Sequence, residues 1–202
     1  MEQKHVTTKK VATRVAEMVE NEKKRITTIC FDYAAWDVMY DYANKQTREF
    51  ESQSLPAAVI PEYDLNVLLV INRVKKTIYH EGYDRSRRRP VRFDPGHPKN
   101  AGLWRSLYAD FDQPSVRSFF SASEHGPLII VSAPILRTDA SGPLNGRVIM
   151  GRLVNPGFNE RIAAAVQEAT ALLAPEQVAG ELNDGQVRRL YRDRSLLKET
   201  RN

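Results

Sequence analysis

Apolar residues in the first quarter of the chain recur at steps of three and four, the spacing of one face of an α-helix. From Ile26 to Ala43 the steps alternate strictly, which is the pattern of a heptad seam. No proline or glycine interrupts residues 6–46. The pattern therefore predicts one helix of about 40 residues, roughly 60 Å long at 1.5 Å per residue. Its seam consists of Val11, Val15, Met18, Ile26, Ile29, Tyr33, Trp36, Tyr40 and Ala43.

A helix of this length exceeds what one small domain can cover. We expect residues 1–46 to form a dimerisation helix that pairs with a second copy of the chain. Residues 47–175 are expected to form the globular domain that follows it. Residues 176–202 are expected to be a C-terminal segment, either a helix or an edge strand around 186–198.

Beyond the helix the periodicity changes to that of strands. Residues 66–73 and 76–84 are rich in Val, Ile and Tyr and predict a hairpin. Residues 118–123 and 128–137 predict a second hairpin, and residues 147–154 a fifth strand. The dipeptide Asn145–Gly146 predicts a tight turn before this last strand. A long loop is expected between Arg85 and Gln113, with a short helix at 103–109, and a helix entered through Pro156 is expected to reach residue 173.

The strands around VLLVI, LIIV and VIM are apolar on both faces. An antiparallel sheet with one wet face would alternate apolar and polar residues instead. We therefore expect the long helix to cover one face and the 85–113 loop to cover the other. The predicted fold class is α+β, with a long N-terminal helix packed on a roughly five-stranded antiparallel sheet and a C-terminal helix. A loop across a sheet face is a favourable place for a small-molecule pocket.

Charge adds one alternative function. The net charge is +5, and the densest basic group is RSRRRPVR at Arg85–Arg92. Pro90 and the absence of apolar periodicity make this segment a loop, and no nucleic-acid-binding signature accompanies it. It is either a solvated loop or a surface for an anionic partner such as a ligand, lipid head groups or, as the less favoured case, nucleic acid.

The sequence gives little indication of enzymatic activity. No catalytic or nucleotide-binding motif occurs, the four histidines are scattered, and no metal-ligand spacing is present. We expect no enzymatic activity in this chain, no cofactor and no metal. The single cysteine, Cys30, lies beside the helix seam and is interpreted as a small apolar residue. The sequence also contains no apolar run of the ~18 residues that a membrane helix needs.

Two blocks of the sequence are similar to a known family. WDVMYDY contributes Trp36, Asp37 and Tyr40, and SAPILRTDASGPLNGRVIMGRLV contributes the second block. This combination resembles the fourth class of CHASE domains, the cyclase- and histidine-kinase-associated sensory extracellular domains. The resemblance covers about residues 26–173. Val38 departs from it, because the family often has a second acidic residue there. The matching positions of the second block are Ala133, Pro134, Ile135, Asp139, Gly142, Pro143, Gly151 and Arg152.

The resemblance implies a PAS-like or Cache-like sensory domain at residues 47–175, on the extracytoplasmic, periplasmic side of a membrane-anchored receptor. It also implies that residues 1–46 form a signalling helix and that residues 176–202 lead towards the membrane. The output module would be a histidine kinase, a diguanylate cyclase or phosphodiesterase, or a chemoreceptor. We expect the domain to bind a small molecule, to dimerise through the N-terminal helix and to bind no nucleic acid. A ligand-free dimerisation and transmission module is the alternative.

Nine residues are candidates for the ligand site, and each also has a structural explanation. The aromatic residues Trp36 and Tyr40 either anchor the helix on the sheet or line a pocket. A buried Asp37 would need a partner, for which Arg152 is the candidate; Arg152 would otherwise bind a carboxylate or phosphate of an anionic ligand. The remaining candidates, from the loop and the adjacent strands, are Tyr83, Trp104, Tyr108, Phe119 and Ser132.

Overall fold

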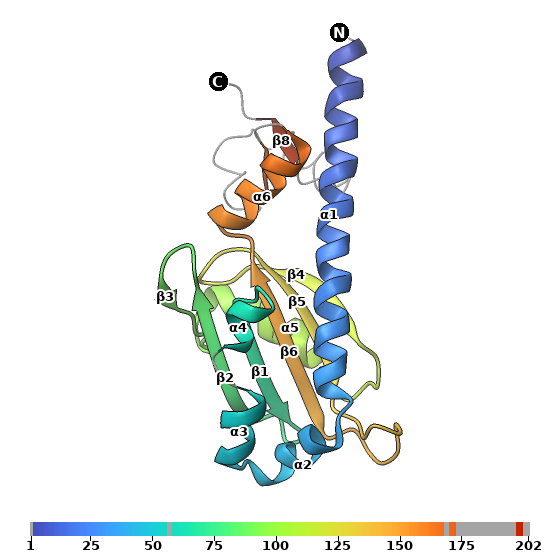
Figure 1. Ribbon diagram of the computed structural model, residues 1–202, viewed down its shortest axis with the longest axis vertical. Coiled ribbons are helices and arrows are strands. Elements are labelled where there is room, and N and C mark those ends of the chain that lie inside the picture. The colour runs from blue at the N-terminus through green and yellow to red at the C-terminus, as the bar shows by residue number, and fades with distance from the viewer. Residues whose placement is uncertain (1, 56–57, 168–169, 173–196, 200–202) are drawn as a thin grey trace. The chain divides into compact units, whose positions relative to one another are not determined.

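The computed structural model describes residues 2–55, 58–167, 170–172 and 197–199. The chain divides into two compact units. One is Lys23–Leu153, and the other combines Met1–Glu22 with Val154–Asn202. Figure 1 shows the elements of both.

The N-terminal helix is shorter than predicted. Helix α1 spans Glu2–Ala34, and the expectation of a single helix through residue 46 is wrong, because a separate helix α2 covers Asp37–Lys45. Trp36 between them is extended, with φ −136° and ψ 127°. The break is stabilised by the distant 135–145 segment. The amide of Leu136 donates to the carbonyl of Ala34 at 3.2 Å, and that of Thr138 donates to Asp37 Oδ1 at 3.2 Å.

The buried side of α1 in the larger unit follows a line of four-residue steps rather than the predicted seam. Ile26, Cys30 and Ala34 are fully buried, whereas Trp36 keeps 40% of its surface exposed. The Cys30 thiol lies 3.3 Å from the carbonyl oxygen of Val148 on the sheet. Cys30 is thus a packed residue of the core, as expected, and this burial raises the pKa of its thiol to about 12.

The main sheet has six antiparallel strands in the order β3-β2-β1-β6-β5-β4. The five predicted strands are all present, and a two-residue strand, β3 at Arg89–Pro90, adds a sixth. Short helices η1 and α5 lie between β3 and β4, and α3 and α4 precede β1. The bounds are β1 Val67–Asn72, β2 Thr77–Asp84, β4 Arg117–Ser121, β5 Leu128–Pro134, β6 Gly146–Leu153, η1 Pro98–Asn100, α5 Ala101–Ala109, α3 Arg48–Ser54 and α4 Val59–Glu62.

The central strands are dry on both faces, as the sequence predicts. Every residue of β5 and β6 is buried, as are the first five of β1. Residues 23–34 of α1 and helix α4 lie in front of the sheet in Figure 1, and α5 lies behind it. We call the 91–113 segment, which contains α5, the lid. Its apolar side chains form one core with the rear face of the sheet: Val67, Leu69, Ile71, Val91, Phe93, Leu103, Trp104, Leu107, Phe111, Leu128, Ile130, Ile149 and Leu153.

The C-terminal unit departs from expectation after its helix. Helix α6 spans Pro156–Val166 rather than reaching residue 173. It begins as predicted at Pro156, where the side chain of Asn155 accepts a hydrogen bond from the amide of Phe158. Thr170–Leu172 then forms strand β7, which pairs with β8 at Leu197–Glu199. Residues 173–196, on which the other C-terminal expectations fall, lie outside the described residues.

The predicted tight turn at Asn145–Gly146 is wrong. β5 ends at Pro134 and β6 begins at Gly146, so an eleven-residue loop separates them. This loop closes where Ile135 donates its amide to the carbonyl of Gly146 at 2.9 Å. Gly146 has φ +127°, and a Cβ there would lie 2.2 Å from the carbonyl oxygen of Ile71. Glycine is therefore required by close approach to β1, not by a hairpin turn.

We expect Gly146→Ala to lower the free energy of unfolding by roughly 2–4 kcal/mol, because it adds a backbone clash to an unfavourable φ. Gly102→Ala is the matched control, since a Cβ at Gly102 meets nothing within 4 Å. That change, within helix α5, should instead be neutral or stabilise by up to about 1 kcal/mol. Urea denaturation of both variants measures the difference, and equal stabilities would contradict the assignment.

Candidate functional site

The nine predicted site residues fall in three separate places in the larger unit. Trp36, Asp37 and Tyr40 lie at the α1–α2 break. The second group lies between the rear sheet face and the lid and consists of Trp104, Tyr108, Phe119 and Ser132. Tyr83 and Arg152 lie near the ends of β2 and β6.

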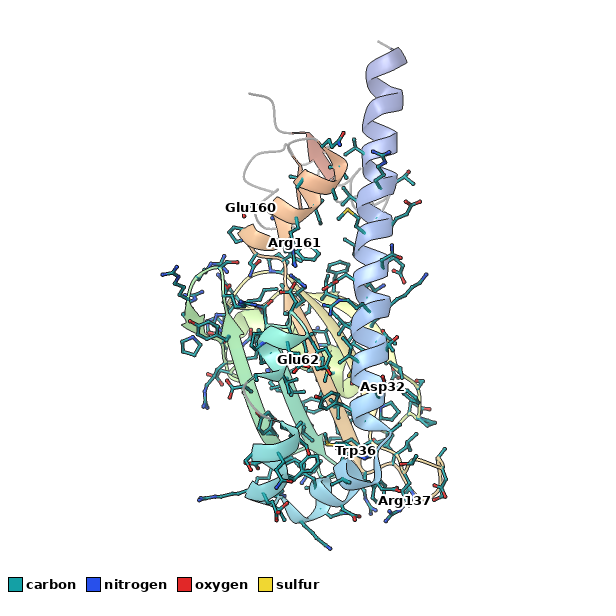
Figure 2. The ribbon with its side chains drawn as sticks, in the orientation of Figure 1. Asp32, Trp36, Glu62, Arg137, Glu160 and Arg161 are labelled. Atoms are coloured by element: carbon teal, nitrogen blue, oxygen red, sulfur yellow. The ribbon has the colours of Figure 1, made fainter. Side chains whose placement is uncertain are left out.

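The α1–α2 break is joined to the 135–145 loop mainly through Tyr40 and Arg137. Tyr40 is buried, and its hydroxyl donates to the carbonyl of Pro143 at 3.0 Å. The Arg137 guanidinium lies 4.4 Å from the centre of the Tyr40 ring. It also lies 3.6 Å from an Asp37 oxygen and 3.7 Å from an Asp41 oxygen. Figure 2 shows Trp36 and Arg137 together at this end of the sheet.

The predicted pairing of Asp37 with Arg152 is therefore wrong. Asp37 is exposed and pairs with Arg137. Arg152 is only 5% exposed, and its guanidinium lies 2.7 Å from Asp64, just after α4. Arg152 does share the α1-facing side of β6 with Val148 and Met150, as alternation along the strand predicted. The two residues thus lie in different ion pairs.

The space under the lid is apolar and aromatic. Trp104 is 6% exposed and stacks on Tyr108 with ring centres 5.8 Å apart. His80 of β2 stacks on Phe93 of the lid at 6.4 Å. Trp104 Nε1 and His80 Nε2 are both buried without a hydrogen-bond partner among the described residues. Burial lowers the pKa of His80 to about 4, with a contribution from Arg92, so the imidazole is neutral near pH 7.

The most deeply buried charge under the lid is Arg147, which the sequence analysis did not single out. Its side chain is 1% exposed, and its Nε donates to the hydroxyl of Ser132 at 2.7 Å. This bond accounts for the hydroxyl of Ser132 among apolar neighbours. Arg147 follows the predicted Asn145–Gly146 turn, and alternation alone would have placed it on the rear face, opposite to Arg152.

The Arg147 guanidinium holds the C-terminal end of the lid through carbonyl oxygens. It donates to Gln113 at 2.8 Å, to Ser115 at 2.6 Å and to Phe111 at 3.1 Å. A cation is favourable here because these carbonyls follow the C-terminus of α5, where the helix dipole is negative. Burial lowers the pKa of Arg147, but guanidinium stays protonated in proteins.

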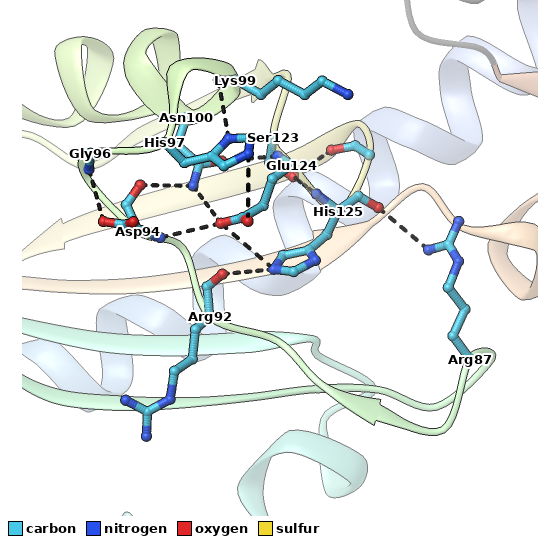
Figure 3. Close-up of polar contacts among 11 residues, drawn as sticks. Arg87, Arg92, Asp94, Gly96, His97, Lys99, Asn100, Ser123, Glu124 and His125 are labelled. Carbon is cyan, nitrogen blue, oxygen red and sulfur yellow. Dashed lines mark hydrogen bonds and ion pairs between the residues drawn. The ribbon is translucent and has the colours of Figure 1, made fainter.

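The other end of the lid is fixed by a polar network around Glu124 in the β4–β5 turn (Figure 3). Glu124 accepts from Asn100 Nδ2 at 2.8 Å, and Asn100 Oδ1 accepts from the Glu124 amide at 2.9 Å. His125 Nε2 lies 2.6 Å from the carbonyl of Arg92. The bond from Asn100 contributes to lowering the pKa of Glu124. The Glu124–His125 pair therefore attaches the lid to the sheet.

Residues 85–88 of the arginine-rich segment form the turn between β2 and β3, as predicted, whereas Arg89–Pro90, also predicted as loop, forms strand β3. The buried carboxylate of Asp84 accepts from Arg87 Nη1 at 2.8 Å and from the amide of Ser86 at 3.1 Å. Tyr83 beside it is 39% exposed. The side chains of Arg85, Arg88 and Arg89 are exposed to solvent.

The described residues contain neither a cluster of metal-binding side chains nor a membrane-spanning helix. Neither the sheet nor the helices bring three or more histidine, cysteine or acidic side chains into a group that could hold a metal ion. None of the described helices combines the length and apolar character needed to cross a membrane.

A family model of the CHASE4 domain matches residues 18–173. The chain belongs to the CHASE4 family. This confirms the resemblance found in the sequence, and it assigns the α+β architecture to a class of sensory domains. Comparison with curated protein sequences finds no match.

Solved structures support the fold of this CHASE4 domain. A domain of a putative sensory box/GGDEF protein from Vibrio parahaemolyticus is 12% identical, with TM-score 0.54, and the match covers 78% of this chain and 64% of that one. The sensor domain of the histidine kinase DctB from V. cholerae is 8% identical, with TM-score 0.54, covering 83% and 59%. The extracellular domain of the putative histidine kinase vpHK1S-Z8 is 13% identical, with TM-score 0.54, covering 85% and 62%. The CHASE4 chain thus spans about three fifths of the length of these structures.

We expect Arg147→Met to lower the free energy of unfolding by about 3–5 kcal/mol, because the carbonyls at the end of the lid lose a buried charged partner. Arg147→Lys should be intermediate, since ammonium cannot reproduce the planar fork. The exposed Arg73 of the β1–β2 turn provides the control, and Arg73→Met should change stability by less than about 0.5 kcal/mol. Chemical denaturation of the three variants measures these values; a stable Arg147→Met protein would refute the anchoring role.

We expect stability to fall on acidification through His80. The pKa of this imidazole is about 4 in the folded protein and near 6.5 in the unfolded chain. The unfolded state therefore binds more protons between these values, and stability is lost as the pH falls from about 6.5 to 4. Because His80 is partly accessible to solvent, screening limits this effect to about 1–2 kcal/mol.

His80→Gln should remove this part of the pH dependence, and His97→Gln, at an exposed loop position, should not. Unfolding curves at pH 7 and pH 4.5 make the comparison. An unchanged pH dependence in His80→Gln would show that other groups are responsible.

Proposed function

We propose that this CHASE4 chain is the extracytoplasmic ligand-sensing domain of a membrane-anchored signal-transduction receptor. Membership of the family supports this role. The domain itself is proposed to be non-catalytic, with any kinase or cyclase activity in another part of the receptor. We further propose that it lies in the periplasm and functions as a homodimer through α1.

The ligand-binding proposal rests on two buried polar atoms on the lid side of the sheet, Trp104 Nε1 and His80 Nε2. Neither atom has a hydrogen-bond partner in the part of the chain that the structure describes. A buried polar atom without a partner costs roughly 1–3 kcal/mol, which a ligand that supplies the bond recovers. The aromatic rings of Phe93, Tyr108 and Phe111 supply apolar contact area around it. This combination of apolar walls and a few polar atoms is typical of small-molecule sites.

The charges under the lid limit the ligand's chemistry. His80 is neutral near pH 7, and the Arg147 guanidinium already donates to several backbone carbonyls and to Ser132. Neither group supplies a free positive charge for a carboxylate. We therefore propose an uncharged ligand with at least one hydrogen-bond acceptor for Trp104. The anionic ligand considered from the sequence is less well supported.

The proposed signal is a shift between two arrangements of the lid and α1. These elements cover opposite faces of the same strands, so a change in packing under the lid alters the surface on which Ile26 and Cys30 rest. Such a shift requires different ligand affinities in the two states, with useful coupling of about 1–3 kcal/mol.

The packed lid core also favours one alternative, a ligand-free module that transmits movement without binding a molecule.

Melting temperature measured against organic acids, amines, nucleotides and uncharged heterocycles tests the proposal. An uncharged compound should raise the melting temperature in a saturable way. If no compound in any class does so, the ligand-free alternative is favoured.

We expect Trp104→Phe to abolish most of the stabilisation by such a compound, because it removes the Nε1–H donor and keeps an aromatic ring. The free variant should remain folded, with stability reduced by about 1–2 kcal/mol at most, since the lost group has no partner. Trp36→Phe, the same change in the exposed tryptophan, is the control and should leave the ligand effect unchanged. Calorimetric titration decides the point, and full affinity in Trp104→Phe would place the ligand elsewhere.

A further inference from the structure

A groove of about 400 Å³ lies at the α1–α2 break, lined by Asp32, Tyr33, Ala35, Trp36 and Thr138. It exists because α1 ends at Ala34 and the 135–145 loop is bonded to the break. Thr138, which forms one wall, is held by its amide bond to Asp37. The groove is on the α1 side of the sheet, away from the lid. Figure 2 labels Asp32 and Trp36 on this stretch of the chain.

Two aromatic rings of the groove are held by contacts with other rings. Trp36 lies against Phe50 of α3, with ring centres 6.0 Å apart, and still has 40% of its surface exposed. Tyr33 makes an edge contact with Tyr63 at 6.2 Å. Because the indole ring of Trp36 is already held in place, a ligand that binds to its exposed, electronegative face costs little side-chain entropy.

The residues of the α1–α2 break are acidic, in contrast to the net charge of the chain as a whole. Residues 31–44 contain Asp32, Asp37 and Asp41 and no lysine or arginine, and residues 135–143 add Asp139 and Arg137. Arg137 is already paired with Asp37 and Asp41. Asp32 is exposed, and its carboxylate makes no hydrogen bond or ion pair with any described residue. The groove therefore has a negative charge available in a protein of net charge +5.

We propose that this groove binds an organic ammonium ion, held over the Trp36 ring with Asp32 as its counter-charge. Tryptophan is the side chain that attracts cations most strongly through its ring face. A cation already lies over an aromatic ring in the same region, since Arg137 sits 4.4 Å from the Tyr40 ring centre. An anion would be repelled by Asp32, and a metal ion would find too few oxygen ligands.

This site is distinct from the lid site and goes beyond the proposed function. Its lining includes residues of the last turn of α1. A ligand bound there would therefore affect this helix directly and not through the sheet. The two sites can be tested separately, because each has one of the chain's two tryptophans. Trp36 reports on the groove and Trp104 on the lid.

The test is a titration of the whole ¹⁵N-labelled chain with choline, followed by the two indole N–H signals in NMR spectra. Trp104→Phe assigns the signals, because it leaves only that of Trp36. The uncharged analogue 3,3-dimethyl-1-butanol has the same shape and is titrated in parallel. We expect choline to shift the Trp36 signal in a saturable way and to leave the Trp104 signal unmoved, and we expect the uncharged analogue to produce little change.

The role of the carboxylate is tested with Asp32→Asn. We expect this variant to bind choline about fivefold more weakly, the loss of one charge interaction at contact distance in water. Glu17→Gln removes an exposed carboxylate from the same helix outside the groove and should bind as the unaltered chain does. Equal shifts by choline and its uncharged analogue, no shift of Trp36, or equal affinity of Asp32→Asn would each overturn the proposal.

Discussion

The central constraint on this CHASE4 domain is that strands β1, β6 and β5 bury both of their faces. A sheet of this kind is stable only when two layers cover it, because each face would otherwise expose several Val, Ile and Leu side chains to water. Residues 23–34 of α1 supply part of one layer and the lid supplies the other. The lid and α1 therefore pack on opposite faces of a single layer of strands. Because the side chains of that layer are tightly packed, a displacement on one face is transmitted to the other.

The lid is fixed at both ends by polar contacts and is apolar between them. Asn100 and Glu124 hold its first end, and Arg147 holds its second end through backbone carbonyls. Satisfied networks of this kind are rigid. Two buried polar atoms have no partner among the described residues: one belongs to His80, which stacks on Phe93 of the lid, and the other to Trp104, which stacks on Tyr108. This is where a small molecule could replace apolar contacts without breaking either end, which is why the proposed ligand site is there and not at Arg147.

Features determined by neighbouring residues could be predicted from the sequence, and features determined by contacts between distant residues could not. The strands and the dry sheet were predictable because runs such as VLLVI and LIIV carry their own signal. The end of α1 was not, because it depends on bonds from Leu136 and Thr138, about 100 residues away. Alternation along β6 placed Arg152 on the correct face, yet it could not choose between Asp37 and Asp64 as its partner. Arg147 was missed because its acceptors are backbone carbonyls, which have no sequence signature.

The two proposed binding regions act on α1 in different ways. A ligand under the lid would reach Cys30 through the sheet, in the middle of the helix's contact with the strands. A cation in the groove would act at the C-terminal end of α1, where the bond from Leu136 to Ala34 closes the break. An ammonium group there would also be close to the negative end of the helix dipole, which favours the helical state of the last turn. In this proposal a ligand under the lid would alter the surface on which α1 rests, and a cation in the groove would stabilise the last turn of the helix.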